Sequence, residues 1–584
     1  PIIERVIAAE ALRRAFLALD PPLAEQAISA STHGDFGETG LWKTTFRKPI
    51  AQWLANAADA VAPTREITHH TELENDDLDR LDAFVRTGLI ERIDRAVDSG
   101  HFDIPELSEL LANAGVLPMF GFPTRARPLY MEAPQSRRSH DKSVVSTRPL
   151  DMAVASFAPG AEVTKNKATH VCVGFAAYRP FRGKLTAVDP LQQRLEIQQC
   201  TACNGVLPTA DAPSRDAPCS ICGGDTRNID LFQPSGFRTD FQPRDYDDTA
   251  EIGSPVDRPV LAWQQEPDGT RIRAVSARSL QARELYTIND RDGDLYAMHR
   301  HEGGYVVTTP DVYDDWPAIP RLADVRDPDL TGAIGAVRPT DVLLIEPGWL
   351  ALPASKGALT VSRARPFSEA ALWSYAEILR IAAADLLSVD PRELDVGLQP
   401  YAAPHGPSRR IFIADRLENG AGYARHLGRP AMLERLLDHA VDVLGPGFMR
   451  TEHRERCEAS CPDCLASYDN RFLHSRLDWR LGLDLAELAA GRDLDERRWL
   501  DDAPGIAASV AAGFELEHVV LDELQALRDS DGTITILGHP IWLADGQPRD
   551  PRQLAAERAS RAPVIRHADL HSALRFPQRI VVPD

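Results

Sequence analysis

The chain has 584 residues, of which 43% are hydrophobic and 26% are charged, and this balance excludes a mainly disordered or fibrous protein. One hydrophobic core cannot serve such a length, so about three to five domains are expected. The net charge of -21 excludes a surface that binds nucleic acid indiscriminately, although local basic grooves are compatible with it.

The first part of the chain, residues 1–115, is predicted to form a helical domain. Its opening apolar residues recur at spacings of three and four: Ile2, Val6, Ala9, Leu12, Phe16 and Leu19. The segment from Leu78 to Ile93 is amphipathic in the same way. Because the chain starts at Pro1, without Met and already within a helical pattern, we expect it to be part of a longer polypeptide.

Residues 116–340 are predicted to form a β-rich domain, because short β-branched and aromatic runs broken by Gly and Pro replace the helical pattern. Thr169–Phe175 is an example. A zinc ribbon is expected as an insertion at residues 197–230. The Pro- and Asp-rich segment from Asp230 to Pro259 is interpreted as a connector to further strands around Arg271–Val307.

Residues 341–490 are predicted to form a zinc-binding α/β domain. A long apolar stripe indicates a helix from Ser368 to Leu386, and Ile411–Ala414 is a buried strand. Gly420-Ala-Gly422 then opens a second helix, from about Tyr423 to Leu444.

Residues 491–584 are predicted to be a C-terminal α/β extension, with strands at Glu517–Leu521, Thr533–Leu537 and Arg579–Val582. The whole chain is therefore expected to be multidomain, of mixed α+β and α/β class. No apolar run approaches the ~20 residues of a membrane-spanning helix, and no basic-then-apolar leader is present, so we expect a cytoplasmic protein without membrane contact.

Seven of the eight cysteines fall in two tight clusters. The first contains two C-x2-C pairs, formed by Cys200, Cys203, Cys219 and Cys222. Each pair can hold one side of a tetrahedral zinc ion, as in a zinc ribbon. Four thiolates fill the coordination sphere and leave no position for water, so a structural zinc is favoured over a catalytic one.

The second cluster, Cys457, Cys461 and Cys464, supplies three thiolates, so a fourth ligand must come from elsewhere or from water. His474, which precedes a helix predicted at Leu477–Leu488, is the first choice. His453 and Cys172 are the alternatives. No H-E-x-x-H relation accompanies the cluster, so a second structural zinc is favoured over a catalytic one.

The sequence contains no glycine-rich loop ending in Gly-Lys-Ser/Thr and no accompanying acidic pair, so an ATPase motor is not expected in this chain. No catalytic residue is assigned. One locally basic strip is the best candidate for nucleic-acid contact, with an ordinary solvated face as the alternative; its residues are Arg125, Arg127, Tyr130, Arg137, Arg138 and Lys142.

Two motifs together resemble the MrfA-type zinc-binding domain. They are the stretch from Asp415 through Gly420-Ala-Gly422-Tyr423, and Cys457-x3-Cys461-Pro-Asp-Cys464-Leu-x-Ser467-Tyr468. That domain lies at the C-terminus of a group of superfamily-two DNA helicases and in DrmB of the DISARM anti-phage system. The resemblance covers roughly residues 340 to 490. Three upstream stretches are similar to the post-motor half of those helicases: His33-Gly-x-Phe-Gly37, Leu117-Pro-Met-Phe-Gly-Phe-Pro123, and Phe157-Ala-Pro-Gly160 with Lys165 and Lys167.

One departure from the family concerns the second cluster: the MrfA type has a fourth cysteine six residues after the Cys464 equivalent, where this chain has Asn470. Either His474 replaces that ligand, or the second site is vestigial. The resemblance implies that zinc organises the domain and is not the catalyst.

The resemblance favours a non-motor, zinc-stabilised region of an ATP-dependent DNA helicase or translocase, acting in DNA repair or phage defence. Its partners would be DNA and the helicase ATPase lobes in cis, and ATP and Mg would bind only in a motor outside this chain. The alternative is a stand-alone scaffold of the DrmB kind that regulates a helicase subunit in trans. A weaker third hypothesis is a metal-dependent nuclease that uses acidic residues near the second cluster.

Overall fold

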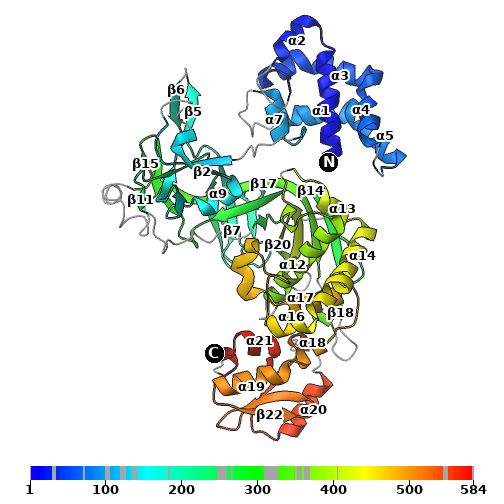
Figure 1. Ribbon diagram of the computed structural model, residues 1–584, viewed down its shortest axis with the longest axis vertical. Coiled ribbons are helices and arrows are strands. Elements are labelled where there is room, and N and C mark those ends of the chain that lie inside the picture. Colours follow the sequence, from blue (N-terminus) through cyan, green and yellow to red (C-terminus); the bar gives the residue numbers. More distant parts are fainter. Residues whose placement is uncertain are drawn as a thin grey trace.

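A computed structural model describes the chain except for residues 1, 29–33, 70, 72, 99–105, 119–125, 135–140, 182–183, 246–258, 265–267, 308–326, 348, 352–357, 361–367, 404–405, 418, 543–549 and 582–584. The molecule is elongated, with a helical lobe at one end, a strand-rich body in the middle and a small mixed lobe at the C-terminal end (Figure 1). This arrangement confirms the expected multidomain α+β class.

The N-terminal lobe is made of short helices around one hydrophobic core. Its elements are α1 (Ile2–Leu17), α2 (Pro21–Ala27), η1 (Thr39–Leu41), η2 (Trp42–Phe46), α3 (Arg47–Asn56), η3 (Ala58–Ala60), α4 (Ala62–Thr68), α5 (Asn75–Ala83), η4 (Phe84–Gly88), α6 (Leu89–Asp98) and α7 (Leu107–Asn113). The buried face of α1 differs in part from the predicted one. Ile2 and Val6 are exposed, whereas Ile7, Ala8 and Ala11 are buried. The sequence pattern was ambiguous there, since apolar residues occur on nearly every side of this helix.

The body is a large mixed sheet. Its strands are β1 (Ala126–Tyr130), β2 (Val144–Pro149), β3 (Glu162–Lys165), β4 (Ala168–Phe175), β7 (Arg194–Cys200), β8 (Val206–Pro208), β9 (Thr226–Phe232), β10 (Phe237–Thr239), β11 (Arg244–Asp245), β12 (Val260–Leu261), β13 (Thr270–Ile272), β14 (Val275–Asn289), β15 (Tyr296–His301), β16 (Gly304–Val307), β17 (Leu330–Glu346), β20 (Leu394–Ala403) and β21 (Gly406–Asp415). Two separate hairpins are β5 (Ala177–Phe181) with β6 (Lys184–Val188), and β18 (Trp349–Ala351) with β19 (Ala358–Thr360). Short helical turns η5 (Asp141–Ser143) and η6 (Thr209–Asp211) and helix α9 (Leu150–Ser156) lie between the strands.

Two long antiparallel strands, β14 and β17, run the length of the body and connect its halves. The first half of β17 pairs with β9 and β15, and its second half pairs with β21. The predicted domain boundary between residues 340 and 341 therefore falls within a strand. The predicted connector from residue 230 is also displaced, because β9 extends to Phe232 and β10 and β11 follow it before the undescribed residues 246–258.

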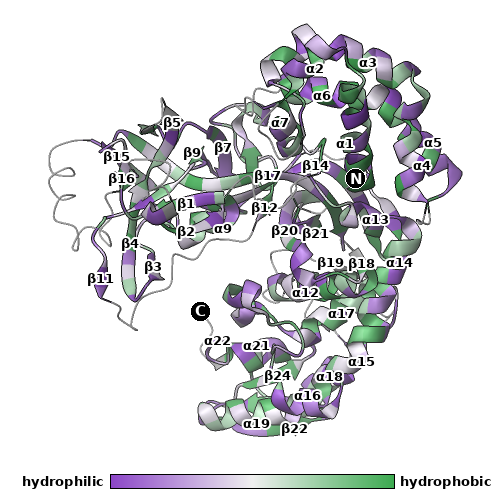
Figure 2. Ribbon diagram, turned by 45° about the horizontal axis from the view of Figure 1, so that its top comes forward, coloured by the Kyte–Doolittle hydropathy of each residue, from purple (hydrophilic) through white to green (hydrophobic). Residues whose placement is uncertain are grey.

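Helix α12 (Ser368–Leu387) packs on the β20–β21 hairpin and forms the centre of the largest hydrophobic core. It is buried on nearly all sides, because α14 (Pro430–His439) and α17 (Trp479–Ala489) cover the face that turns away from the sheet. Figure 2 shows this interior as a mainly hydrophobic layer. The remaining helical segments around this core are η7 (Pro391–Glu393), α13 (Tyr423–Leu427), η8 (Ala440–Leu444), α15 (Gly445–Phe448), α16 (Thr451–Arg456) and η9 (Tyr468–Arg476).

The helix predicted from Tyr423 to Leu444 is interrupted. Helix α13 ends at Leu427, and α14 restarts at Pro430 with an extended residue, Arg429, before it. Proline disfavours helical geometry in the preceding residue but is well accommodated in the first turn of a new helix. The Gly428-Arg429-Pro430 sequence therefore breaks the segment in two.

The C-terminal lobe is a four-stranded sheet of β22 (Glu517–Leu521), β23 (Leu524–Arg528), β24 (Ile534–Gly538) and β25 (Ile565–Asp569). Around it lie α18 (Arg497–Leu500), α19 (Ala503–Gly513), η10 (Pro540–Trp542), α20 (Pro551–Ser560), α21 (Leu570–Arg575) and α22 (Gln578–Val581). The strand predicted at Arg579–Val582 is wrong, because the described part of that segment lies in α22. Within the described part of the chain, no helix is both long and apolar enough to cross a bilayer.

Candidate metal centres

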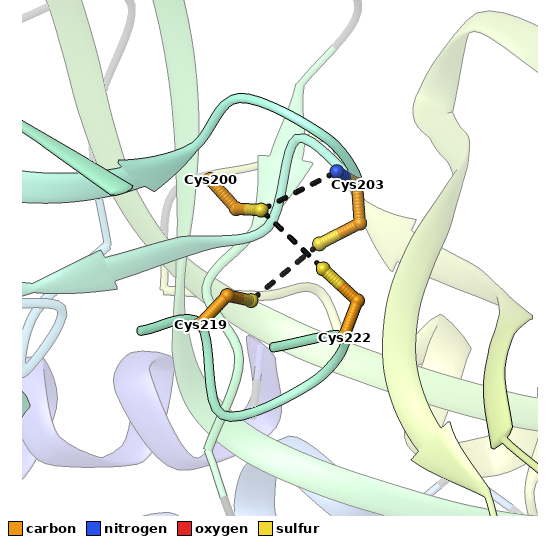
Figure 3. A group of neighbouring side chains, drawn as sticks. All are labelled: Cys200, Cys203, Cys219 and Cys222. Atoms are coloured by element: carbon orange, nitrogen blue, oxygen red, sulfur yellow. Dashed lines mark hydrogen bonds between the residues drawn. The ribbon is translucent and has the colours of Figure 1, made fainter. Parts of the chain in front are cut away.

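The first cysteine cluster lies at the end of the β7–β9 pair (Figure 3). Cys200 closes β7, Cys203 follows in the next turn, and Cys219 and Cys222 lie in the loop that leads into β9. The four sulfurs point toward one common centre. The Sγ–Sγ distances are 3.5 Å for Cys200 with Cys222 and 3.7 Å for Cys203 with Cys219.

These distances fit a tetrahedral zinc ion. An ion bonded to sulfur at ~2.3 Å places the sulfurs of a tetrahedron ~3.8 Å apart. A disulfide would need ~2.05 Å, and all eight cysteines are free. The structure therefore brings together the predicted four-thiolate set, and the donor chemistry suits a closed structural site.

Local backbone geometry prepares the first pair of cysteines for a metal. The Cys200 sulfur accepts backbone N–H groups of Ala202 and Cys203, both at 3.4 Å, and Asn204 adopts a left-handed φ of 59°. Burial acts to raise the pKa of the Cys200 thiol, but these N–H groups and the neighbouring thiols together lower it. Burial raises the pKa of Cys203, so the cluster needs a cation to hold all its thiolates at neutral pH.

The second cluster contains a histidine that the sequence placed only among the alternatives. One ligand atom each from His453, Cys457, Cys461 and Cys464 lie within 4.8 Å of one another. His453 lies in α16, one turn before Cys457, and the other two cysteines follow in a tight turn. Three thiolates and one imidazole again give the complete set of four ligands of a closed zinc site.

The orientation of His453 suits metal binding. Its Nδ1 lies 2.8 Å from the carbonyl oxygen of Phe448, which can only accept, so Nδ1 carries the proton. The Nε2 atom is buried and has no hydrogen-bond partner among the described residues. A lone pair directed at three thiols, with the other ring nitrogen held by a carbonyl, is the usual arrangement of a zinc-binding histidine.

The thiols of the second cluster lie in direct contact with one another. The Cys457 and Cys464 sulfurs are 3.7 Å apart, and the backbone N–H of Cys461 donates to the Cys464 sulfur at 3.1 Å. The hydrogen bond from Cys457, opposed by burial and supported by the Cys461 N–H, lowers the pKa of Cys464 to about 5. The same thiol pair raises the pKa of Cys457. Cys464, the thiol with the lowered pKa, thus lies beside His453.

The preference for His474 as fourth ligand is corrected by this geometry. The His474 Nε2 lies 3.0 Å from the Ser467 carbonyl oxygen and 2.9 Å from Asn470 Oδ1, outside the ligand group. Asn470 is buried, and its amide donates to the Leu465 carbonyl at 2.8 Å. The side chains of His474 and Asn470 therefore stabilise the turn that follows the cluster. Cys172, the other alternative, lies in β4 within a separate core, where burial raises its pKa.

One sequence signal could have identified His453. A residue four positions before Cys457 lies on the same face if the intervening segment is helical, and residues 451–456 do form α16. His474 is ten residues beyond Cys464, and nothing in the sequence indicated that its ring would turn back to the chain at Ser467. The helical spacing between His453 and Cys457 was therefore a better predictor of the fourth ligand than the position of His474 after the cysteines.

The predicted nucleic-acid strip is only partly described, since Arg125, Arg137 and Arg138 lie outside the described residues. Tyr130 is 3% exposed and packs edge-on against Tyr178 at 4.9 Å between ring centroids, so its ring cannot stack on a base. Burial also raises its pKa to about 12. Arg127 donates to the carbonyl of Pro234 at 2.7 Å, whereas Lys142 is exposed in η5. The burial of Tyr130 in β1 therefore argues against the nucleic-acid contact predicted for its side chain.

The glycine loop after β21 is held by one buried carboxylate. Asp415 accepts backbone N–H groups from the four residues that open α13: Ala421 (2.6 Å), Gly422 (2.5 Å), Tyr423 (3.1 Å) and Ala424 (2.7 Å). Gly420 and Gly422 have φ of 71° and 92°, and a Cβ on Gly420 would lie 2.7 Å from the Asp341 carboxyl carbon. The motif thus needs glycine for both conformation and space.

The same loop contacts the helical lobe. The Arg5 guanidinium on α1 donates to the carbonyl oxygens of Asn419 at 2.5 Å and Gly420 at 2.7 Å. Arg5 is 8% exposed, so these bonds are made largely away from water. The side chain of Asn419 in turn donates to the Asn113 carbonyl of α7 at 3.3 Å. This loop therefore joins the N-terminal helical lobe, by charged and polar contacts, to the zinc-cluster region, meaning β20, β21 and the helices up to α17 that pack on them.

Parts of this chain are similar to known proteins. Residues 375–465 match the family model of the MrfA Zn-binding domain, which confirms the resemblance inferred from the motifs. The match includes all four residues of the second cluster and ends before His474. The Druantia protein DruE of Escherichia coli (strain UMEA 4076-1) is 26% identical over 426 residues, or 66% of this chain and 22% of its own length. The chain thus spans less than a quarter of that relative.

Among solved structures, the crystal structure of the DUF1998 helicase MrfA bound to DNA is similar over 50% of this chain and 35% of its own. The identity is 10% and the TM-score is 0.22, so this likeness is too distant to support an argument about geometry.

Proposed function

We propose that this chain is a zinc-organised, non-motor region of an ATP-dependent DNA helicase or translocase, which contacts DNA and couples to the ATPase lobes. The observation that carries the proposal is the MrfA Zn-binding domain match at residues 375–465, with His453, Cys457, Cys461 and Cys464 gathered at its end. Because the motifs of this chain resemble those of helicases with this domain and of DrmB, the proposal extends to DNA repair or anti-phage defence.

The chemistry of both clusters supports a structural role for zinc. Each cluster supplies four protein ligands, so an ion bound there would have no open position for a reacting water. A metal-dependent nuclease centred on the second cluster is therefore disfavoured. Zinc would instead fix the orientation of the elements that carry its ligands.

Coupling between parts of the molecule has a physical basis in the glycine loop. Asp415 fixes the loop to β21, and Arg5 fixes it to the helical lobe. Such a series of contacts gives a physical path for coupling between the two lobes. We propose this loop as the joint between the helical lobe and the zinc-cluster region.

The test is the DNA-stimulated ATPase activity of the native gene product that contains this chain, with and without Cys457→Ser. We expect ATP hydrolysis that DNA stimulates in the unaltered protein and a loss of stimulation in the variant, because the disordered cluster no longer links DNA contact to the motor. If the activity appears only after a separate helicase subunit is added, the chain acts in trans as a DrmB-like scaffold. Absence of any DNA-dependent ATPase in either arrangement contradicts the proposal.

A further inference from the structure

An exposed aromatic pair follows the second cluster directly. In η9 the side chains of Tyr468 and Phe472 are 77% and 53% exposed, and they are the only two aromatic side chains this exposed among the described residues. Large aromatic rings usually bury most of their surface. Two of them on one turn therefore form a feature that folding alone does not explain.

Arg471 joins the two rings into one surface. Its guanidinium carbon lies 4.6 Å from the Tyr468 ring centroid and 4.3 Å from that of Phe472. Both distances are within the range of cation–π attraction. The three side chains, named here the Tyr468–Phe472 platform, thus present two π faces and a planar cation at one place on the surface.

The backbone beneath the platform is firmly held. Asn470, whose side chain is 1% exposed, accepts the N–H of Ser467 at 2.7 Å and donates to the Leu465 carbonyl. Leu473 packs into the large core, and Arg575 of α21 donates to the Ser475 carbonyl at 2.8 Å. The rings are therefore presented on a preorganised turn, which lowers the conformational entropy lost when a ligand binds.

The charge of the platform favours an anionic partner. No carboxylate of the described residues pairs with Arg471, whose only polar contact is to the Tyr468 carbonyl at 3.3 Å. Arg476 pairs with Glu369 at 3.3 Å, but both groups are well exposed, so water screens that pair. With Asp469, the segment Tyr468–Arg476 has two arginines against one carboxylate, in a chain of net charge -21.

We infer that the Tyr468–Phe472 platform binds single-stranded DNA by stacking bases on the two rings, with Arg471 contacting the phosphate backbone. A single strand exposes its base faces, whereas a duplex hides them in its own stack, so exposed rings select the single strand. The unpaired guanidinium supplies the cation that a phosphate needs. This inference rests on the proposed function, because it names the DNA form and the residues behind the DNA contact.

The test measures binding of fluorescein-labelled oligo(dT) and of a labelled duplex to the zinc-loaded full chain by fluorescence anisotropy. We expect Tyr468→Ala with Phe472→Ala to weaken oligo(dT) binding roughly 30-fold, since each lost stack costs about a factor of five or more. Duplex binding should change little. Tyr468→Phe with Phe472→Tyr should retain affinity, because both replacements keep the rings.

Matched controls separate stacking from loss of apolar surface and from loss of charge. Leu17→Ala with Val520→Ala removes two side chains that are 71% and 60% exposed elsewhere, and should leave oligo(dT) affinity unchanged. Arg471→Ala should lower the salt slope of oligo(dT) binding by roughly 0.7. Arg497→Ala removes a 78% exposed arginine that pairs with Asp495, and it should leave the salt slope unchanged. Zinc content and thermal unfolding verify that each variant is folded.

The outcomes distinguish this inference from the proposed function. If the unaltered chain binds oligo(dT) and the double alanine variant binds it equally well, the platform is not the site, while the DNA contact of the proposed function stands. If the unaltered chain binds neither DNA form, that contact fails as well. If the double variant changes only the oligomeric state in sedimentation, the platform is a protein interface and the inference is overturned.

Discussion

The two cysteine clusters have the same number of ligands but very different surroundings. The first holds only a small satellite core of Cys200, Cys203 and Ile221 at the end of two strands. The second is part of the largest core in the molecule, which includes Cys457, Cys464 and helix α12. A zinc site can therefore stabilise a single turn or a whole domain, depending on how many residues pack around its ligands.

The largest effect is expected from Cys464→Ser. Loss of this buried ligand removes the second zinc and leaves unpaired thiols inside the main core, so the domain should lose at least about 3 kcal/mol of stability. Elemental analysis should show a fall from two zinc ions per chain to one, and chemical denaturation should show the loss. Two zinc ions in the folded variant would contradict the assignment.

The two histidines provide the next test, because they distinguish the structural from the sequence-based choice of ligand. His453→Ala should reduce the zinc content from two to about one, since its Nε2 faces the thiols. His474→Ala should keep both ions, because its ring contacts Ser467 and Asn470. Elemental analysis of zinc in both variants and in the unaltered chain decides between the two ligands. Loss of one zinc ion in His474→Ala but not in His453→Ala would assign His474 as the fourth ligand.

Buried carboxyls accompany the second cluster, so pH should affect that region. Burial raises the pKa of Asp478 to about 7, and Trp479, its neighbour in α17, packs edge-on against His453. Because the folded state holds this proton up to a higher pH than the unfolded chain, with a pKa of ~3.9, stability should fall as pH rises from about 4 to 7.

This contribution amounts to at most about 1.4 kcal/mol per pH unit. Asp478→Asn keeps the shape without the charge, so urea denaturation between pH 5.5 and 7.5 should show a flatter pH dependence than in the unaltered chain. The exposed Asp531→Asn serves as a control with no buried proton. An unchanged slope in Asp478→Asn would assign the pH dependence to other groups.

The smallest effect on global stability is expected from Cys222→Ser in the first cluster. This variant should also lose one zinc, but the main unfolding transition should shift by no more than about 1 kcal/mol, because only the ribbon turns depend on the ion. Hydrogen exchange should show lost protection confined to the ends of β7 and β9. A shift as large as that of Cys464→Ser would erase the difference between the clusters.

The sequence alone determined the first cluster completely. Its ligands lie in C-x2-C pairs, and such pairs bring both thiols to one ion through local turns that need no distant contacts. Strands such as β4 and β22 and helix α12 were also predicted, because alternation and apolar stripes are local signals. The MrfA-type resemblance followed from the same short-range motifs.

Tertiary structure decided the rest. Burial of Tyr130 against Tyr178 and exposure of Tyr468 depend on packing partners distant in sequence, so composition could not separate the buried ring from the exposed ones. The choice of His453 over His474 depended on a hydrogen bond to Phe448 that fixes the ring. The boundary expected at residue 340 fell within β17, because strand pairing, which joins distant segments, determines where one unit of the sheet ends.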